Sequence, residues 1–254
     1  MKLYWAYATE SNQTGANTLN EDALLVNGRT IQSQFAMNSG ELTSNSEVFA
    51  VSDGLHCSPF AARASREVLS ALHRIWANAP AMHPGRKITG VHHAISGLCG
   101  TESKLFGMAA TLVACEVRAD ELMIYHCGDS QAWIIDSSKQ TRLTTDHTMA
   151  EFYAAQGHLT QDDHLEAAGA LLSLDSYFVA DPEADRPRNS LLKLNWNRSQ
   201  TLILVSDGLS GLAPHSFSRP SGESLEKYCG RLVASAQAAG SDDNLTVIAI
   251  SRVS

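Results

Sequence analysis

Two short apolar runs, far apart in the chain, end in the same pentapeptide. Residues 48–51 and residues 202–205 are aliphatic or aromatic, and each run closes with V-S-D-G-L. Apolar runs rich in β-branched residues and bounded by Asp-Gly predict buried strands that end in a tight turn. Each strand would therefore carry an aspartate, Asp53 or Asp207, to the edge of a sheet.

The same pattern of apolar positions predicts further strands and helices. Residues 59–77 repeat apolar side chains at helical spacing with a proline at the start, a weaker repeat runs from Ile88 to Leu98, and a third helix is expected at 224–239. The remaining predicted strands are residues 23–26, 110–117, 122–127, 132–135 and 245–250. The polar link at 118–121 is short enough for a hairpin, which predicts that the three middle strands form an antiparallel meander.

Strands in groups, followed by helices, favour antiparallel sheets with helices packed outside rather than alternating βαβ units. The predicted fold class is therefore α+β. Nothing rich in Pro, Gly or Ser divides the 254 residues, so we expect a single domain over 1–254.

Composition narrows the function and the compartment. The net charge of −8 argues against a nucleic-acid surface, and no stretch approaches the roughly 18 apolar residues of a membrane span. The five cysteines are scattered and contain no C-x-x-C pair, so neither a disulfide framework nor a zinc ribbon is indicated. We expect a protein of the reducing cytoplasm that binds neither nucleic acid nor membrane.

Aspartates stand at the ends of five predicted strands. They are Asp22, Asp53, Asp129, Asp207 and Asp243. Aspartate is frequent in turns because it caps and bends the backbone, which accounts for any one of them. Several carboxylates without clustered histidine or cysteine suit Mg²⁺ or Mn²⁺ better than zinc, and several in one cleft indicate two such ions.

Seven short blocks, in this order and at this spacing, resemble the metal-dependent PP2C-type (PPM) serine/threonine phosphatases over nearly the whole chain. The blocks are Asn20-Glu21-Asp22-Ala23, Ala50-Val51-Ser52-Asp53-Gly54, Gly107-Met108-Ala109-Ala110-Thr111-Leu112-Val113, Cys127-Gly128-Asp129-Ser130-Gln131-Ala132, Leu143-Thr144-Thr145-Asp146-His147-Thr148, Val205-Ser206-Asp207-Gly208-Leu209 and Asp243-Asn244-Leu245-Thr246-Val247. The resemblance implies a sandwich of two antiparallel β-sheets flanked by helices, with a variable flap at about 148–185.

The resemblance also implies a centre of two Mn²⁺ or Mg²⁺ ions and a role for each matching residue. Asp53 would bridge both ions, the Gly54 carbonyl would bind one, and Asp207 with Asp243 would hold the other. Asp129 would serve a weaker third ion found in bacterial members. Glu21 and Asp22 would support the attacking water.

The activity implied by the resemblance is hydrolysis of phosphoserine or phosphothreonine in a protein substrate. The enzyme would be monomeric, and a cognate serine/threonine kinase would make its substrates.

Three features depart from the family pattern. Asn17 stands where the family commonly has an arginine that grips the substrate phosphate, so Asn17 is the candidate substrate-binding residue here. Ala109 and Ala110 replace a Gly-Thr pair. His56 lies one position later than a histidine proposed as general acid in some relatives, so a surface or turn role is expected for it. Structural roles are expected for two other histidines, His147 at the turn before the flap and His126 within a strand.

Two other enzyme classes are disfavoured by single residues, and one non-enzymatic function remains open. A haloacid-dehalogenase-type phosphatase would need a second aspartate where Leu55 and Leu209 stand. An SGNH esterase would need an Asp-x-x-His near the C-terminus, which is missing. The alternative from a different class is a catalytically weak PP2C-like module that binds a phosphoprotein or partner as a regulator, and the missing arginine motivates it.

Overall fold

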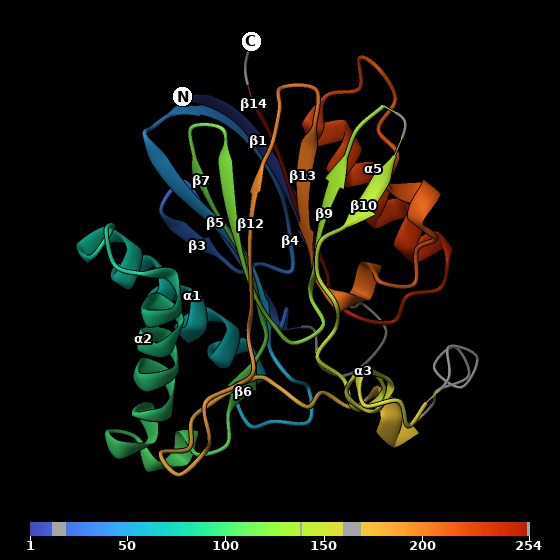
Figure 1. Ribbon diagram of the computed structural model, residues 1–254. Helices are drawn as coiled ribbons and strands as arrows, with labels where there is room; N and C mark the ends of the chain where they lie inside the picture. Colours follow the sequence, from blue (N-terminus) through green and yellow to red (C-terminus); the bar gives the residue numbers. More distant parts are fainter. Residues whose placement is uncertain (12–18, 138, 160–168, 253–254) are drawn as a thin grey trace.

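Two six-stranded antiparallel β-sheets stack face to face in the computed structural model, which describes residues 1–11, 19–137, 139–159 and 169–252 (Figure 1). Sheet A has the strand order β10-β9-β13-β14-β1-β4. Its strands are β1 (Lys2–Glu10), β4 (Phe35–Thr43), β9 (Gln131–Ile135), β10 (Gln140–Arg142), β13 (Thr201–Val205) and β14 (Leu245–Arg252).

Sheet B has the strand order β12-β8-β7-β5-β2-β3. Its strands are β2 (Asp22–Val26), β3 (Arg29–Ile31), β5 (Ser46–Asp53), β7 (Leu112–Arg118), β8 (Glu121–Cys127) and β12 (Ser190–Asn195). A separate two-stranded sheet joins β6 (Ala109–Ala110) to β11 (Phe178–Val179).

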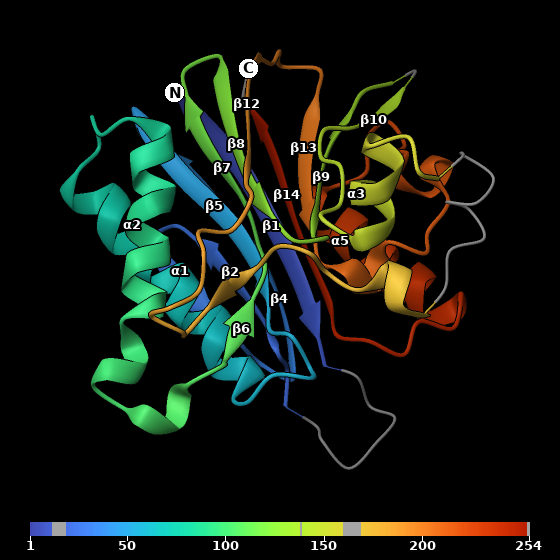
Figure 2. The same cartoon turned by 60° about the horizontal axis from the view of Figure 1, so that its bottom comes forward.

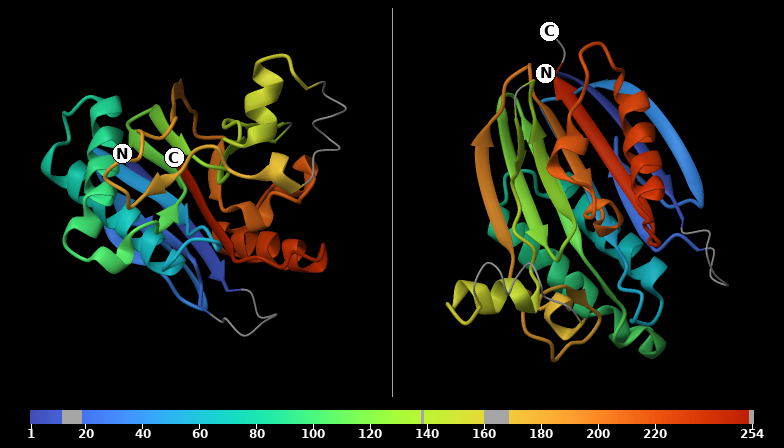
Figure 3. Two further views of the ribbon diagram at one scale, coloured as in Figure 1. Left: turned by 90° about the horizontal axis from the view of Figure 1, so that it is seen from below. Right: turned by 90° about the vertical axis from the view of Figure 1, so that its right-hand side faces the viewer.

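Helices cover the outer faces of both sheets, so the molecule has four layers (Figures 2 and 3). Helices α1 (Ala61–Asn78) and α2 (Pro84–Ser96) pack on sheet B, and α5 (Leu225–Ala238) packs on sheet A. Helix α3 (Met149–Ala155) lies in the predicted flap. No helix in the described ranges is long and apolar enough to cross a bilayer.

Three layers of buried apolar side chains hold this arrangement. Leu24, Phe49 and Ile248 belong to the cluster between the two sheets, while Val68 and Leu225 belong to the clusters beneath α1 and α5. Alternate residues of a strand point to opposite faces of its sheet, so a central strand buried on both faces contributes to two layers. That is why β5 and β13 appear in the sequence as unbroken apolar runs. The α+β sandwich predicted from the sequence is confirmed.

Strand register places the aspartate-bearing strand ends at one end of the sandwich. In sheet B, Asp22 at the start of β2 pairs with Asp53 at the end of β5. In sheet A, Val205 at the end of β13 pairs with both Val247 near the start of β14 and Gln131 at the start of β9. The loops that carry Asp129, Asp207 and Asp243 therefore leave the same end of sheet A.

The predicted meander is wrong for its third strand. The hairpin between β7 and β8 is confirmed, with Arg118 paired to Glu121 across the turn. Strand β9 instead pairs with β13 and β10 in sheet A. The crossing occurs at Gly128, whose φ of +110° lies in a region that L side chains rarely adopt. A Cβ at this position would also lie 2.6 Å from the Thr111 side chain.

Other boundaries differ from the predictions in ways that have simple causes. Helix α1 begins at Ala61 rather than at Pro59, because Phe60 takes a left-handed conformation that interrupts the helix. Strands β1, β4 and β12 were not predicted. The prediction missed β1 although this strand lies inside sheet A and is mostly buried. Strands β4 and β12 are edge strands that are mostly exposed, so no continuous apolar run marks them.

Candidate metal centre

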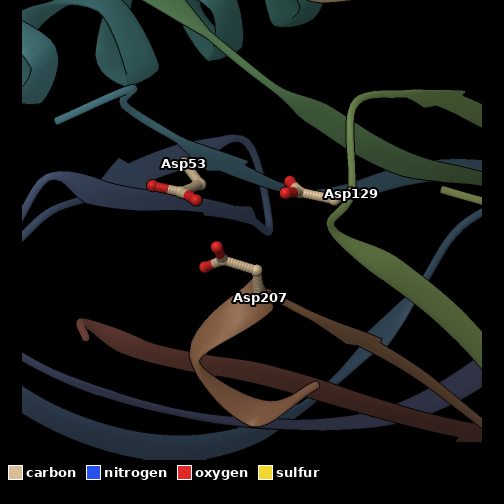
Figure 4. Close-up of side chains that lie close together, drawn as sticks. All are labelled: Asp53, Asp129 and Asp207. Carbon is tan, nitrogen blue, oxygen red and sulfur yellow. The ribbon is translucent and has the colours of Figure 1, made fainter. Parts of the chain in front are cut away.

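Three aspartate carboxylates converge at the end of the sandwich where the two sheets meet. Asp53, Asp129 and Asp207 each offer an oxygen, and these oxygens all lie within 4.8 Å of one another. Figure 4 shows the three side chains pointing toward a common space from three separate chain segments. The segments are the end of β5, the loop between β8 and β9, and the short 3-10 helix Asp207–Leu209. All three side chains are partly exposed, so the space between them is open to solvent.

Crowding and burial disfavour the charged form of these groups. The pKa of Asp53 is raised well above its ordinary value, chiefly by burial and then by the charges of Asp207 and Asp22. Burial, followed by neighbouring aspartate charges, also raises the pKa of Asp129 to about 8 and that of Asp207 to about 6. Carboxylates held this close resist ionisation unless a cation is present among them.

The donor set fits a hard divalent cation. The carboxylate atoms Oδ1 of Asp129 and Oδ1 of Asp207 are buried and have no hydrogen-bond partner. Buried polar atoms are almost always paired, so unpaired anionic oxygens that face a shared space indicate a missing positive ligand. An all-oxygen set without a converging thiolate or imidazole matches Mg²⁺ or Mn²⁺.

The serines of the repeated pentapeptide are buried tethers beneath this centre. Ser52 Oγ donates to the carbonyl oxygen of Thr111 at 2.6 Å, and Ser206 Oγ donates to Oδ2 of Asp22 at 2.7 Å. Ser206 Oγ also accepts the backbone N–H of Thr246 at 3.0 Å. Each copy of V-S-D-G-L therefore fixes its strand end to a neighbouring segment, and neither Asp-Gly forms a hairpin turn.

Asp22 lies directly below the convergent carboxylates. It is 1% exposed, and burial raises its pKa to about 7 even though Ser206 donates to it. Its second oxygen, Oδ1, has no hydrogen-bond partner. The Asp22 carboxylate therefore has one oxygen held by Ser206 and one oxygen without a partner.

Glu21 faces a histidine. Its Oε2 lies 2.9 Å from Nδ1 of His56, and the hydrogen bond with Glu21 raises the pKa of that exposed histidine. The backbone of Glu21 is held as well, because its N–H donates to Oδ1 of Asn244 at 2.7 Å and its carbonyl accepts the N–H of Gly54 at 3.1 Å. Glu21 is not among the three convergent carboxylates.

Gly54 and Asp243 border the centre without belonging to the convergent group. Gly54 packs so tightly against α1 that a Cβ would lie 2.1 Å from the carbonyl oxygen of Ala61. Asp243 is exposed, and its Oδ1 accepts the backbone N–H of Asn244 at 2.7 Å. Asp207 and Asp243 both line a cavity of about 320 Å³ beside the end of α5, and neither Asp53 nor Asp129 lines it.

The remaining predicted residues divide into two groups. Asn17 lies outside the described residues. The structural roles predicted for two histidines are confirmed: His147 Nδ1 accepts the N–H of Gly128 at 3.2 Å, and His126 is buried 4.6 Å from the His147 ring, centroid to centroid. Burial lowers the pKa of His126 to about 3 and that of His147 to about 4, so both rings are neutral at physiological pH.

The sequence did not identify the hydroxyl groups that orient the carboxylates. Thr111 Oγ1 accepts the backbone N–H of Asp53 at 3.1 Å and lies 2.8 Å from Ser130 Oγ, which links two of the metal-facing segments. Thr9 Oγ1 bonds Thr246 Oγ1 at 2.8 Å and accepts from Nδ2 of Asn20 at 2.8 Å. Of these residues, all except Thr9 belong to the seven sequence blocks. Membership in a block was the only sign in the sequence that they matter. Hydroxyl pairing between distant segments cannot be read from spacing.

Comparisons with known proteins agree with this architecture. The family model described as Protein phosphatase 2C matches residues 25–247. The serine/threonine phosphatase stp of Listeria welshimeri is 25% identical over 171 residues, which cover 66% of this chain and 66% of that protein. The matched region thus spans just under two thirds of that relative.

Solved structures share the fold. The Mycobacterium tuberculosis serine/threonine phosphatase PstP/Ppp superposes with a TM-score of 0.77 at 20% identity, covering 99% of both chains. The catalytic domain of the serine threonine protein phosphatase PstP, crystallised with two manganese ions, gives a TM-score of 0.72 at 21% identity over 100% of both chains.

Proposed function

The chain belongs to the protein phosphatase 2C family, and on that premise we propose that it hydrolyses phosphoserine and phosphothreonine in protein substrates with the help of Mn²⁺ or Mg²⁺. The observation that carries the proposal is the convergence of Asp53, Asp129 and Asp207, whose oxygens lie within 4.8 Å of one another, together with the buried, unpaired Oδ1 atoms of Asp129 and Asp207. The manganese ions in the structurally similar PstP domain support the choice of metal.

The arrangement suggests how the carboxylates would share two ions. Asp53 lies beside both Asp129 and Asp207, so it is the candidate bridge, with the Gly54 carbonyl next to it in the chain. Asp207 and Asp243 would hold the second ion. Asp129 would serve a weaker third ion or complete the first site.

Two divalent ions held by these carboxylates would supply an acidified water and would offset the charge that develops on the phosphoryl oxygens. The chain's own groups orient that reaction. Asp22, with Oδ2 fixed by Ser206, keeps Oδ1 free to accept a hydrogen bond from the attacking water. Thr111 and Ser52 hold the backbone around Asp53, so its carboxylate needs little reorganisation. Hydrolysis by water requires no covalent enzyme intermediate.

The substrate would be a phosphoprotein made by a cognate serine/threonine kinase, and the enzyme would act as a monomer. Residues 1–254 would form one catalytic domain, with the segment at about 148–185 as a flap beside the centre. All five cysteines are free. This is consistent with the reducing cytoplasm as the proposed location.

Replacing Asp53 by Asn tests the proposal. The change removes a charged ligand from the centre while keeping the size of the side chain, so Mn²⁺-dependent hydrolysis of p-nitrophenyl phosphate should fall at least about 100-fold with the fold retained. Asp136→Asn, far from the centre at the end of β9, is the matched control. Near-normal turnover of Asp53→Asn at saturating Mn²⁺ would contradict the assignment. Inactivity of the wild type, with tight binding to a phosphoprotein, would favour a regulatory module.

A further inference from the structure

Phe60 breaks two local rules at the start of α1. Its φ of +54° and ψ of +40° place it in the left-handed region, which is costly for a residue with a bulky side chain. It also occupies the N-cap position, where Ser, Thr, Asp or Asn would satisfy a free N–H, and it provides no side-chain cap. Positions that violate local rules without a structural gain are candidates for function.

Packing of the Phe60 ring into the core does not offset this backbone strain. It is 50% exposed, and the neighbouring Pro59 is exposed too. A second aromatic, Phe106, is 58% exposed, and it precedes Gly107, on which a Cβ would lie 3.8 Å from the Pro59 ring. Each of the two exposed phenylalanines is thus one residue away from a contact at Pro59, Phe60 as its chain neighbour and Phe106 through Gly107.

This aromatic surface, formed by Pro59, Phe60 and Phe106, is joined directly to the metal centre. The residue after Phe60 is Ala61, whose carbonyl packs on Gly54, next to Asp53. The loop after Phe106 returns to the same turn, because the Leu55 N–H donates to the Ala109 carbonyl at 3.0 Å. The segments that carry the two rings therefore both contact the turn that directly follows Asp53.

We propose that Phe60 and Phe106 form a docking surface for an apolar side chain that flanks the phosphorylated residue of a protein substrate. The inference rests on the proposed phosphatase function and adds a substrate class to it. Covering half-exposed aromatic rings with an aliphatic side chain is favourable, because it removes apolar surface of both groups from water.

The test compares two phosphoserine peptides that differ only in carrying Leu or Gly next to the phosphoserine. For the wild type, kcat/KM on the Leu peptide should exceed that on the Gly peptide about 10-fold. Phe60→Ala should reduce this ratio to near 1, and Phe106→Ala should reduce it partly. The ratio cancels any general effect of a variant on turnover. Phe35→Ala is the matched control, because Phe35 is also a largely exposed phenylalanine (63%) but lies on the edge strand β4.

A second variant separates docking from folding. Phe60→Gly removes the ring and suits the left-handed backbone, so it should keep or raise Tm, by about 2–4 °C, while it also abolishes the Leu preference. An undiminished Leu preference in Phe60→Ala, or an equal loss in Phe35→Ala, would overturn the inference. Fluorescence anisotropy with non-hydrolysable phosphonate versions of both peptides gives the same ratio as Kd values. Failure of the proposed hydrolysis is therefore distinguishable from failure of the docking surface.

Discussion

At the scale of single residues, the carboxylates around the centre differ in how firmly each is held. Asp22 has one oxygen fixed by Ser206, whereas Asp129 and Asp207 each present an unpaired Oδ1 to the common space. The backbone of Asp53 is fixed by Thr111. Asp129 stands in the sharp loop after Gly128.

Asp129→Ala should weaken metal binding without abolishing it. If Asp129 serves a labile third ion, the variant needs a higher Mn²⁺ concentration for half-maximal turnover, by about 10-fold, and calorimetry still finds two tight sites. Loss of a tight site would instead make Asp129 a ligand of the main pair, which its contact with Asp53 and Asp207 also allows. An unchanged metal titration with lowered Tm would leave only a role in shaping the turn.

The pH dependence of metal-free stability follows from the raised pKa values. A carboxyl group with a higher pKa in the folded protein makes the folded state bind more protons, so stability falls as pH rises toward the folded pKa. The pKa values of Asp22 and Asp129 are about 7 and 8, against an ordinary 3.8. The neutral His126 and His147 act in the opposite sense, but only below their ordinary value of 6.5. Between pH 6.5 and 8 the carboxylates should dominate.

Tm measured in EDTA should therefore fall by a few degrees between pH 6.5 and 8. Added Mn²⁺ should raise Tm more at pH 8 than at pH 6.5, because the ion binds the deprotonated carboxylates. Asp129→Asn should flatten the metal-free slope. A metal-free Tm that rises over this interval would contradict the burial of these groups.

At the scale of elements, a buried ion pair joins α2 to sheet B. Lys87 is 0% exposed, and its Nζ lies 3.1 Å from Oε2 of Glu116. The Glu116 carboxylate also accepts hydrogen bonds from Tyr125 at Oε2 and from Arg118 at Oε1. The Lys87 ammonium lies 4.5 Å from the centroid of the Trp76 ring. A buried ion pair stabilises little over an apolar pair, but removing one partner leaves the other uncompensated.

Lys87→Met should lower the free energy of unfolding by about 1–3 kcal/mol, since Glu116 keeps its other donors. Urea denaturation measures this change. Lys193→Met removes an exposed pair with Glu121 and should have little effect. Glu116 and Glu121 both lie toward the end of sheet B that is opposite Asp53. Phosphatase turnover should therefore be unchanged in both variants. A Lys87→Met protein as stable as the wild type would mean that the methionine packs as well as the ion pair.

At the scale of the whole molecule, negative charge gathers in one segment of the chain. Residues 143–185 contain no Lys or Arg but nine acidic side chains. Within the described part of this segment, Asp146 and Asp175 form ion pairs with Arg142 and Arg188, which flank it. Asp162, Asp163 and Glu166 lie outside the described residues.

Phosphopeptides flanked by Lys or Arg should therefore be hydrolysed faster than those flanked by Glu or Asp. We expect about a 10-fold difference in kcat/KM at low salt, mainly through the rate of association, and a much smaller difference at 0.5 M salt because exposed charges are screened. Stopped-flow binding at two salt concentrations checks this. Equal rates at low salt would mean that the acidic segment is only a solvated surface.

The sequence by itself determined most of the buried strands, with β1 as the exception, and the main helices. A strand buried on both faces, such as β5 or β13, must be apolar throughout, so it can be recognised without its neighbours. The repeated V-S-D-G-L identified Asp53 and Asp207 for the same reason, since a carboxylate that ends a buried strand needs a partner.

Only the tertiary structure decided which strand pairs with which and which carboxylates meet. Strand β9 is apolar and short, and its sequence suits either sheet, so its place in sheet A depends on the turn at Gly128. The edge strands β4 and β12 are mostly exposed, and only a few of their side chains, such as Leu42 and Leu194, pack against the core, so no clear pattern marks them. The meeting of Asp53, Asp129 and Asp207 depends on the stacking of two sheets. Distances between segments remote in sequence are fixed by packing, which local patterns do not encode.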